Sequence, residues 1–146
     1  MRLCARVVHT KRVDARTPIG YGHVYRTQRP ATIATVPVGY ADGYPRLAGQ
    51  SGHVVISGHR LPIAGRISMD QLTADAGDTP IKIGDEVELW GGALPVEDVA
   101  EAAQTISYEV LAGVSARVPR VFIEGGQVRA VRTLLSGLTG PGRSGR

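Results

Sequence analysis

The chain has 146 residues and a formal net charge of +4 at pH 7, and it is 42% hydrophobic and 21% charged. This composition is typical of a globular chain of one domain, and no apolar run approaches the roughly 20 residues of a membrane-spanning helix. A single cysteine, Cys4, excludes an internal disulfide and a cysteine metal site. Because Arg2 and Arg6 interrupt the N-terminal stretch, a secretory signal is not expected, and we predict a cytoplasmic protein with no membrane partner.

The positive charge is spread too evenly to predict a nucleic-acid partner. Fifteen arginines and only two lysines, Lys11 and Lys82, are scattered singly along the chain. The one dense basic stretch lies at the C-terminus, where Gly, Pro, Ser and Arg predominate. We therefore expect no nucleic-acid binding, one domain over residues 1–134 and a disordered Gly/Arg-rich tail over residues 135–146.

Short apolar runs, separated by many of the 19 glycines and nine prolines, predict a mainly β fold. The expected strands cover residues 3–8, 32–38, 53–56, 61–67, 86–90 and 118–123. The run 86–90 alternates polar and apolar residues, so one of its faces should be buried and the other solvated. Tight turns are expected at residues 58–59 and 125–126.

One segment has helical rather than strand spacing. Val96, Val99, Ala100 and Ala103 recur on one face, and Pro95 stands near the start. Acidic residues crowd the first turn, where the helix dipole favours them. We predict one short helix over residues 96–103, and its continuation after Ser107 stays open.

Common catalytic and metal-binding patterns are missing from the sequence. The four histidines share no metal-ligand spacing, no glycine run matches a phosphate loop, and no Ser/His/Asp set stands out. Three clusters nevertheless carry reactive side chains. They are Gly20-Tyr21-Gly22, the turn from Gly39 to Arg46, and the segment from Gly65 to Gln71.

Each cluster has both a functional and a structural interpretation. A tyrosine between two glycines can present its hydroxyl to a ligand, or the glycines can form a bulge in a strand. The second cluster places two phenols, a carboxylate and a guanidinium on a turn that could also be a plain Asp-Gly turn. In the third, Arg66 and Asp70 could simply form an ion pair at a strand end.

Together the clusters resemble the C-terminal domain of bacterial alanine racemases. The resemblance covers residues 3–135 and rests on five motifs in the order and at about the spacing of that family. They are Gly20-Tyr21-Gly22, Val38-Gly39-Tyr40-Ala41-Asp42-Gly43, Gly65-Arg66-Ile67-Ser68-Met69-Asp70-Gln71, Ile106-Ser107-Tyr108-Glu109-Val110 and Arg117-Val118-Pro119-Arg120.

The resemblance implies a closed barrel-like β domain of an enzyme that interconverts L- and D-alanine for peptidoglycan synthesis. In this family an N-terminal (β/α)₈ barrel holds pyridoxal 5′-phosphate through a Schiff-base lysine, and each active site of the homodimer combines one barrel with the C-terminal domain of the other subunit. Neither Lys11 nor Lys82 lies in such a lysine motif. We therefore expect a domain that is inactive by itself, with alanine, the barrel domain and a second subunit as its partners.

The resemblance also implies residue roles. Tyr21 matches the tyrosine that works as a base on one face of the substrate. Met69 matches the residue whose backbone N–H meets the substrate carboxylate, and Tyr108 matches the tyrosine that helps hold the cofactor phosphate. The remaining matches line the access corridor to the active site: Tyr40, Arg46, Arg66 and Ile106.

Two other functions remain open from the sequence. The chain could be a non-enzymatic β-barrel that binds an acidic partner through its basic surface, in which case binding should weaken as salt rises. It could also belong to a racemase for another amino acid, such as serine, because much of the substrate pocket would lie in the absent barrel.

Overall fold

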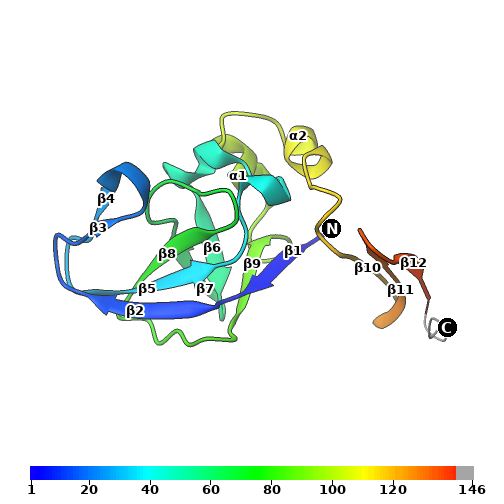
Figure 1. Cartoon of the computed structure of the whole chain (residues 1–146), viewed down its shortest axis with the longest axis horizontal. Helices are drawn as coiled ribbons and strands as arrows, with labels where there is room; N and C mark the ends of the chain where they lie inside the picture. Colours follow the sequence, from blue (N-terminus) through cyan, green and yellow to red (C-terminus); the bar gives the residue numbers. More distant parts are fainter. Residues whose placement is uncertain (141–146) are drawn as a thin grey trace. The chain divides into compact units, whose positions relative to one another are not determined.

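A computed structural model describes residues 1–140, and the chain divides into two compact units, Met1–Gly113 and Val114–Arg146. The first unit is built from nine strands and two short helices (Figure 1). Its four-stranded antiparallel sheet has the order β1 (Leu3–Arg6), β9 (Glu86–Trp90), β6 (His53–Ile56) and β7 (His59–Pro62). Its three-stranded antiparallel sheet has the order β2 (His9–Val13), β5 (Ala31–Val36) and β8 (Leu72–Gly77).

The two sheets are joined along both sides. On one side, the Val7 N–H donates to the carbonyl of Asp85 and the Val8 N–H donates to that of Thr35. The pairing partner of the N-terminal segment therefore changes from the β9 segment to β5 within two residues. On the other side, Ile63 bridges to Ala74 and the Ala64 N–H donates to the carbonyl of Thr73. The links place β7 beside β8 and β1 in line with β2.

The core of the first unit lies between these sheets and the helices. Its largest fully buried side chains include Trp90, Tyr44, Ile56, Leu72 and Leu89. The rings of Tyr44 and Trp90 stack with centroids 5.9 Å apart. This apolar burial stabilises the framework from which the loops project.

Two short helices are present where the sequence analysis placed one. The predicted helix is confirmed as α1 (Val96–Ala102), with Val99 and Ala100 buried. It ends because Gln104 adopts a left-handed φ of 57° and Ile106 is extended. The chain then forms α2 (Ser107–Ala112), so the continuation after Ser107 that the sequence left open is a second helix, and the unit has two helices rather than one. Across residues 1–140, none of the helices has the length and apolar character needed to cross a bilayer.

The strands at residues 53–56 and 86–90 are confirmed with their predicted bounds, but several others differ. The run predicted over 3–8 ends at Arg6, where its pairing partner changes. The run predicted over 61–67 ends at Pro62, because the chain turns away at Gly65 with a φ of 92°. The hairpin turn occupies residues 57–58 rather than 58–59.

The prediction of a solvated polar face on β9 is also wrong at one residue. Glu88 is buried because its carboxylate pairs with Arg2 and accepts the N–H groups of Ala93 and Leu94. Strands β2 and β8 were not expected, since polar side chains interrupt their apolar residues.

The second unit contains a three-stranded antiparallel sheet of β10 (Arg120–Glu124), β11 (Gln127–Thr133) and β12 (Gly137–Thr139). The predicted turn at residues 125–126 is confirmed between β10 and β11. Within the segment predicted to be a disordered tail, residues 137–139 form β12, and residues 141–146 lie outside the described residues.

Candidate functional site

Five of the seven residues singled out from the sequence line one hollow of about 520 Å³. The five are Tyr21, Tyr40, Arg46, Arg66 and Met69. They come from three loops of the first unit that are separated by up to 48 residues in the chain, so the fold brings the three clusters together. Ser68, Asp70 and Gln71 complete the wall on the side of Met69.

Tyr21 stands at the tip of a short hairpin formed by β3 (Pro18–Ile19) and β4 (Tyr25–Arg26). Figure 1 shows this hairpin projecting from the β2–β5–β8 sheet. Between the two strands, the chain makes one 3₁₀ turn, Tyr21–His23, and Tyr21 is 72% exposed. The flanking glycines have left-handed φ values, so they form a tight turn rather than a bulged strand and present the phenol to solvent.

A second wall of the hollow depends on a close approach of two backbone segments. Gly39 precedes the 3₁₀ turn Tyr40–Asp42, and a Cβ on Gly39 would overlap the carbonyl oxygens of Ser68 and Met69. Across this contact the Tyr40 N–H donates to the Ser68 carbonyl at 3.1 Å, and the Ala41 N–H donates to the Met69 carbonyl at 3.0 Å. Tyr40 and Met69 are therefore held on one rigid wall.

Two cations against one carboxylate, that of Asp70, line the hollow and together favour an anionic ligand. Arg46 and Arg66 both lie at the surface, and their guanidinium groups can draw in a carboxylate. Asp42 is buried and its carboxylate accepts the Gly39 N–H at 2.9 Å, so it stabilises the turn that carries Tyr40.

Ile106 and Tyr108 line a separate hollow of about 530 Å³ at the ends of α1 and α2. Tyr108 is 78% exposed, and Glu97 and Glu101 share the same wall. Two carboxylates are poor neighbours for a phosphate, so this hollow does not by itself form a phosphate site. The first unit thus divides the seven residues into a group of five and a pair.

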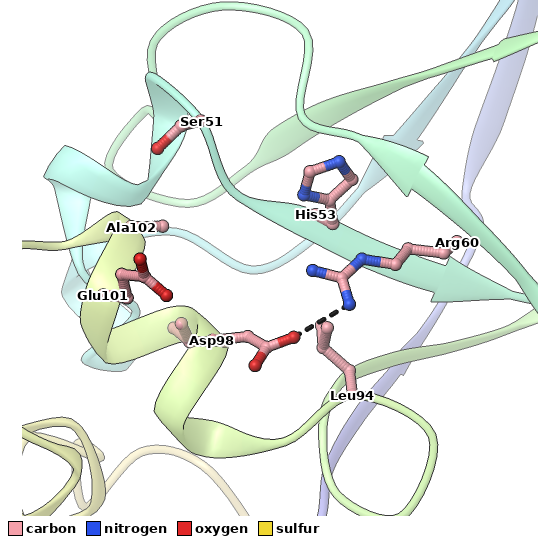
Figure 2. A pocket seen from close by; sticks show the side chains of 8 residues that line it. Ser51, His53, Arg60, Leu94, Asp98, Glu101 and Ala102 are labelled. Atoms are coloured by element: carbon pink, nitrogen blue, oxygen red, sulfur yellow. Dashed lines mark hydrogen bonds and ion pairs between the residues drawn. The ribbon is translucent and has the colours of Figure 1, made fainter.

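A further polar hollow of about 430 Å³ lies between β6, β7 and α1 and contains none of the seven residues. Figure 2 shows His53 and Arg60 on the strands facing Asp98 and Glu101 on the helix. Arg60 and Asp98 form an ion pair of 2.8 Å. Burial and the nearby Arg60 lower the pKa of His53. The paired charges fasten α1 to the sheet, and the candidate site is therefore placed at the hollow of Tyr21.

One contact beside Tyr21 was not predicted from the sequence. The Tyr25 hydroxyl donates a 2.6 Å hydrogen bond to the carboxylate of Asp75 in β8. Partial burial, together with this bond, raises the pKa of Tyr25 to about 12. The signal in the sequence was weak, because Asp75 lies 50 residues away on a strand that the hydrophobic pattern did not predict.

This shift predicts an alkaline loss of stability. Because the folded pKa of Tyr25 lies above its ordinary value of 10.0, its contribution is complete below about pH 10 and is lost as the pH rises through about 12. Urea unfolding at pH 9 and at pH 11.5 measures this loss. The free energy of unfolding should fall more between the two pH values for the wild-type chain than for Tyr25→Phe. Equal drops in the two proteins would contradict the assignment.

The described residues offer neither a metal site nor a covalent anchor for an aldehyde cofactor. Among residues 1–140 no group of three or more His, Cys, Asp or Glu side chains is placed to hold a metal ion. Covalent capture of an aldehyde needs an amine, and neither lysine of the chain lines the hollow of Tyr21 or that of Tyr108. The chain therefore fits a cofactor site as a contributor of phenols and cations, not as the covalent anchor.

A family model described as the C-terminal domain of alanine racemase matches residues 1–122. The chain belongs to the alanine racemase family. The match includes the Tyr21 hairpin, both walls of the hollow and the two helices of the first unit.

Relatives in this family agree with the match. The alanine racemase of Stutzerimonas stutzeri is 47% identical over 124 residues, which are 84% of this chain and 35% of that protein. The structure of the Clostridium difficile 630 alanine racemase in complex with cycloserine has a TM-score of 0.84 at 40% identity and covers 92% of this chain and 36% of that one. The Bartonella henselae alanine racemase with covalently bound pyridoxal phosphate has a TM-score of 0.80 at 41% identity, with 84% and 34% covered. The chain thus spans about a third of the length of these relatives.

Proposed function

We propose that this chain is the C-terminal domain of an alanine racemase and supplies one side of a composite active site. The observation that carries the proposal is the gathering of Tyr21, Tyr40 and Met69 with two arginines around one open hollow. The hollow is a half-site, because it has an exposed phenol and cations but no amine for a cofactor. A partner domain that covers it would complete the site.

In this proposal Tyr21 is the proton-transfer group of the chain. Racemisation removes the Cα proton from one face of alanine and returns a proton to the other, which two groups on opposite sides can do. The hairpin holds the Tyr21 hydroxyl in the open, where it can reach the Cα of a bound amino acid from one side. The group on the opposite side would belong to the barrel domain.

The other residues bind and guide the substrate. The backbone N–H of Met69 would donate to the alanine carboxylate, a role that does not depend on its side chain. Arg46 and Arg66 would attract that carboxylate along the access corridor. Tyr40 beside them, and Ile106 from its separate hollow, would narrow the corridor in the complete enzyme. The Tyr108 hydroxyl would contact the cofactor phosphate once the barrel domain supplies the cations that its own hollow lacks.

Pyridoxal 5′-phosphate, when bound, supplies electron delocalisation that makes the Cα proton of an amino acid easier to remove. The Bartonella henselae relative carries this group covalently bound. In this chain the contribution to such a site is limited to the Tyr21 and Tyr108 hydroxyls and the neighbouring cations. We therefore propose that the 146-residue chain does not racemise alanine without the barrel domain.

The proposal extends to assembly, cell biology and fold. We propose that the chain is part of a cytoplasmic homodimer that makes D-alanine for peptidoglycan. Residues 1–134 would form its C-terminal β domain. We also propose that the strands of the first unit close into a barrel-like ring. The pairing of β6 with both β7 and β9, the turn from β1 into β2 and the bridge from Ile63 to Ala74 support this closure.

The test is reconstitution. The 146-residue chain, purified from a host without alanine racemase, is mixed with a separately produced barrel half of a family relative and pyridoxal phosphate. Racemisation of L-alanine should appear only in the mixture, and serine should compete poorly. Activity of the chain by itself, or no activity from two folded halves that form a complex, would contradict the proposal.

A further inference from the structure

The hairpin that carries Tyr21 is held by backbone hydrogen bonds at its base, between residues 16–17 and Thr27, but only sparsely toward its tip. Strands β3 and β4 pair at only two positions, Pro18 with Arg26 and Ile19 with Tyr25. His23, in the turn between them, has a left-handed φ of 51°, which is costly for a residue with a Cβ. An isolated two-residue ladder with such a turn would open readily, so contacts to other elements must fix the position of Tyr21.

The base of the hairpin is fastened by Thr27. Its buried hydroxyl donates to the carbonyl of Asp14 at 2.7 Å and accepts the Thr17 N–H at 3.0 Å. These bonds hold the two ends of the hairpin together. They lie on the far side of the ladder from Tyr21, so they leave the direction of the tip undetermined.

Near the tip, a side-chain hydrogen bond ties the hairpin to β8. Tyr25 lies two residues after the turn, and its hydroxyl donates to Oδ2 of Asp75 at 2.6 Å. The other carboxylate oxygen of Asp75 accepts the Gly77 N–H at 2.8 Å, so the acceptor is itself fixed on β8. Hydrogen bonds to a carboxylate are among the stronger ones in proteins.

The hairpin also packs against the backbone at Gly65, close to the base of the Tyr25 side chain. A Cβ on Gly65 would lie 2.9 Å from the carbonyl oxygen of Ile19 and 3.5 Å from the Cβ of Tyr25. The hairpin therefore rests directly on the backbone of the segment that continues into Arg66 and Met69. The Tyr25–Asp75 hydrogen bond lies beside this contact, next to the segment that carries Arg66 and Met69.

We propose that Tyr25 and Asp75 are positioning residues, whose hydrogen bond holds the Tyr21 phenol in register with the Arg66–Met69 wall. Neither residue lines the hollow, so both act through the hairpin. The inference rests on the proposed function for its catalytic consequence. Its structural part, an ordered hairpin, is testable on the 146-residue chain directly.

The first experiment measures amide hydrogen exchange across residues 19–26 in the wild-type chain and in Tyr25→Phe, which keeps the ring and removes only the hydroxyl. Exchange should become about tenfold faster in the variant, as expected when one hydrogen bond to a charged group is lost. Tyr44→Phe is the matched control. Among the described residues the buried Tyr44 hydroxyl has no hydrogen-bond partner, so its removal should leave exchange in the hairpin unchanged.

The second experiment uses the reconstituted enzyme. Tyr25→Phe should lower kcat by about tenfold with KM changed less than twofold, because one clamp holds the proton-transfer group. Asp75→Ala should lower kcat at least as much, because it also removes the acceptor of the Gly77 N–H, and the double variant should be no worse than Asp75→Ala. When Tyr21 is already replaced by phenylalanine, Tyr25→Phe should lower kcat by less than twofold further. A general loss of structure would not produce this result.

The outcomes separate this inference from the proposed function. If Tyr25→Phe leaves hairpin exchange within twofold of the wild type, the clamp is refuted whatever the activity. Additive effects of Tyr25→Phe and Asp75→Ala on kcat would also overturn it. If the hairpin loosens as expected but the wild-type mixture never racemises alanine, the clamp stands and the proposed function fails.

Discussion

Replacing Tyr21 by phenylalanine should lower racemisation by the reconstituted enzyme by about 100-fold or more, which is the loss typical of a missing proton-transfer group. The substitution removes one hydroxyl and keeps the ring. Because Tyr21 is 72% exposed, the free energy of unfolding should change by less than about 0.5 kcal/mol. Initial rates in both directions, with urea unfolding of the same samples, measure the two effects.

The directions of the reaction add a specific check. If Tyr21 serves one face of the substrate, removing its hydroxyl should slow exchange of the Cα proton of one alanine enantiomer in deuterated water more than that of the other. Tyr44→Phe is the control for loss of a tyrosine hydroxyl outside the hollow. A Tyr21→Phe enzyme that keeps a third or more of the wild-type rate would rule out this role.

The second large effect is expected at Gly39. A methyl group there would overlap the carbonyl oxygens of Ser68 and Met69, and both are backbone atoms that cannot rotate away. Gly39→Ala should therefore force apart the two backbone segments that form the Tyr40–Met69 wall, break the hydrogen bonds of Tyr40 and Ala41 between them, and destabilise the chain by about 3 kcal/mol. Urea unfolding followed by Trp90 fluorescence measures the loss.

Gly92→Ala is the matched control, since a Cβ on Gly92 meets nothing within 4 Å. Gly92→Ala should change the free energy of unfolding by less than about 0.5 kcal/mol. If Gly39→Ala unfolds at the same urea concentration as this control, the close contact does not hold the wall. Reconstituted Gly39→Ala enzyme should also show a raised KM for alanine, because Met69 moves with the wall.

The sequence offered candidate residues for the site, but it did not predict which of them would lie together in the fold. Glycines around Tyr21 and the turn at Asp42-Gly43 are local signals, since backbone conformation at such positions depends on neighbouring residues. That Tyr21, Tyr40 and Met69 line one hollow, whereas Ile106 and Tyr108 line another, depends on contacts between distant segments. The Tyr25–Asp75 bond spans 50 residues and has no local pattern at all.

The amino-acid sequence by itself determined the mainly β character of this protein, the helix α1, the strand β6 and the identity of its exposed phenols. These follow from side-chain periodicity and from the positions of proline and glycine, all of which act over a few residues. Only the tertiary structure decided where β1 passes into β2, why Glu88 is buried and how the close contact at Gly39 joins the segments of Tyr40 and Met69. Those features arise from pairing and close packing between segments far apart in the chain, and their free energy depends on partners that no local pattern specifies.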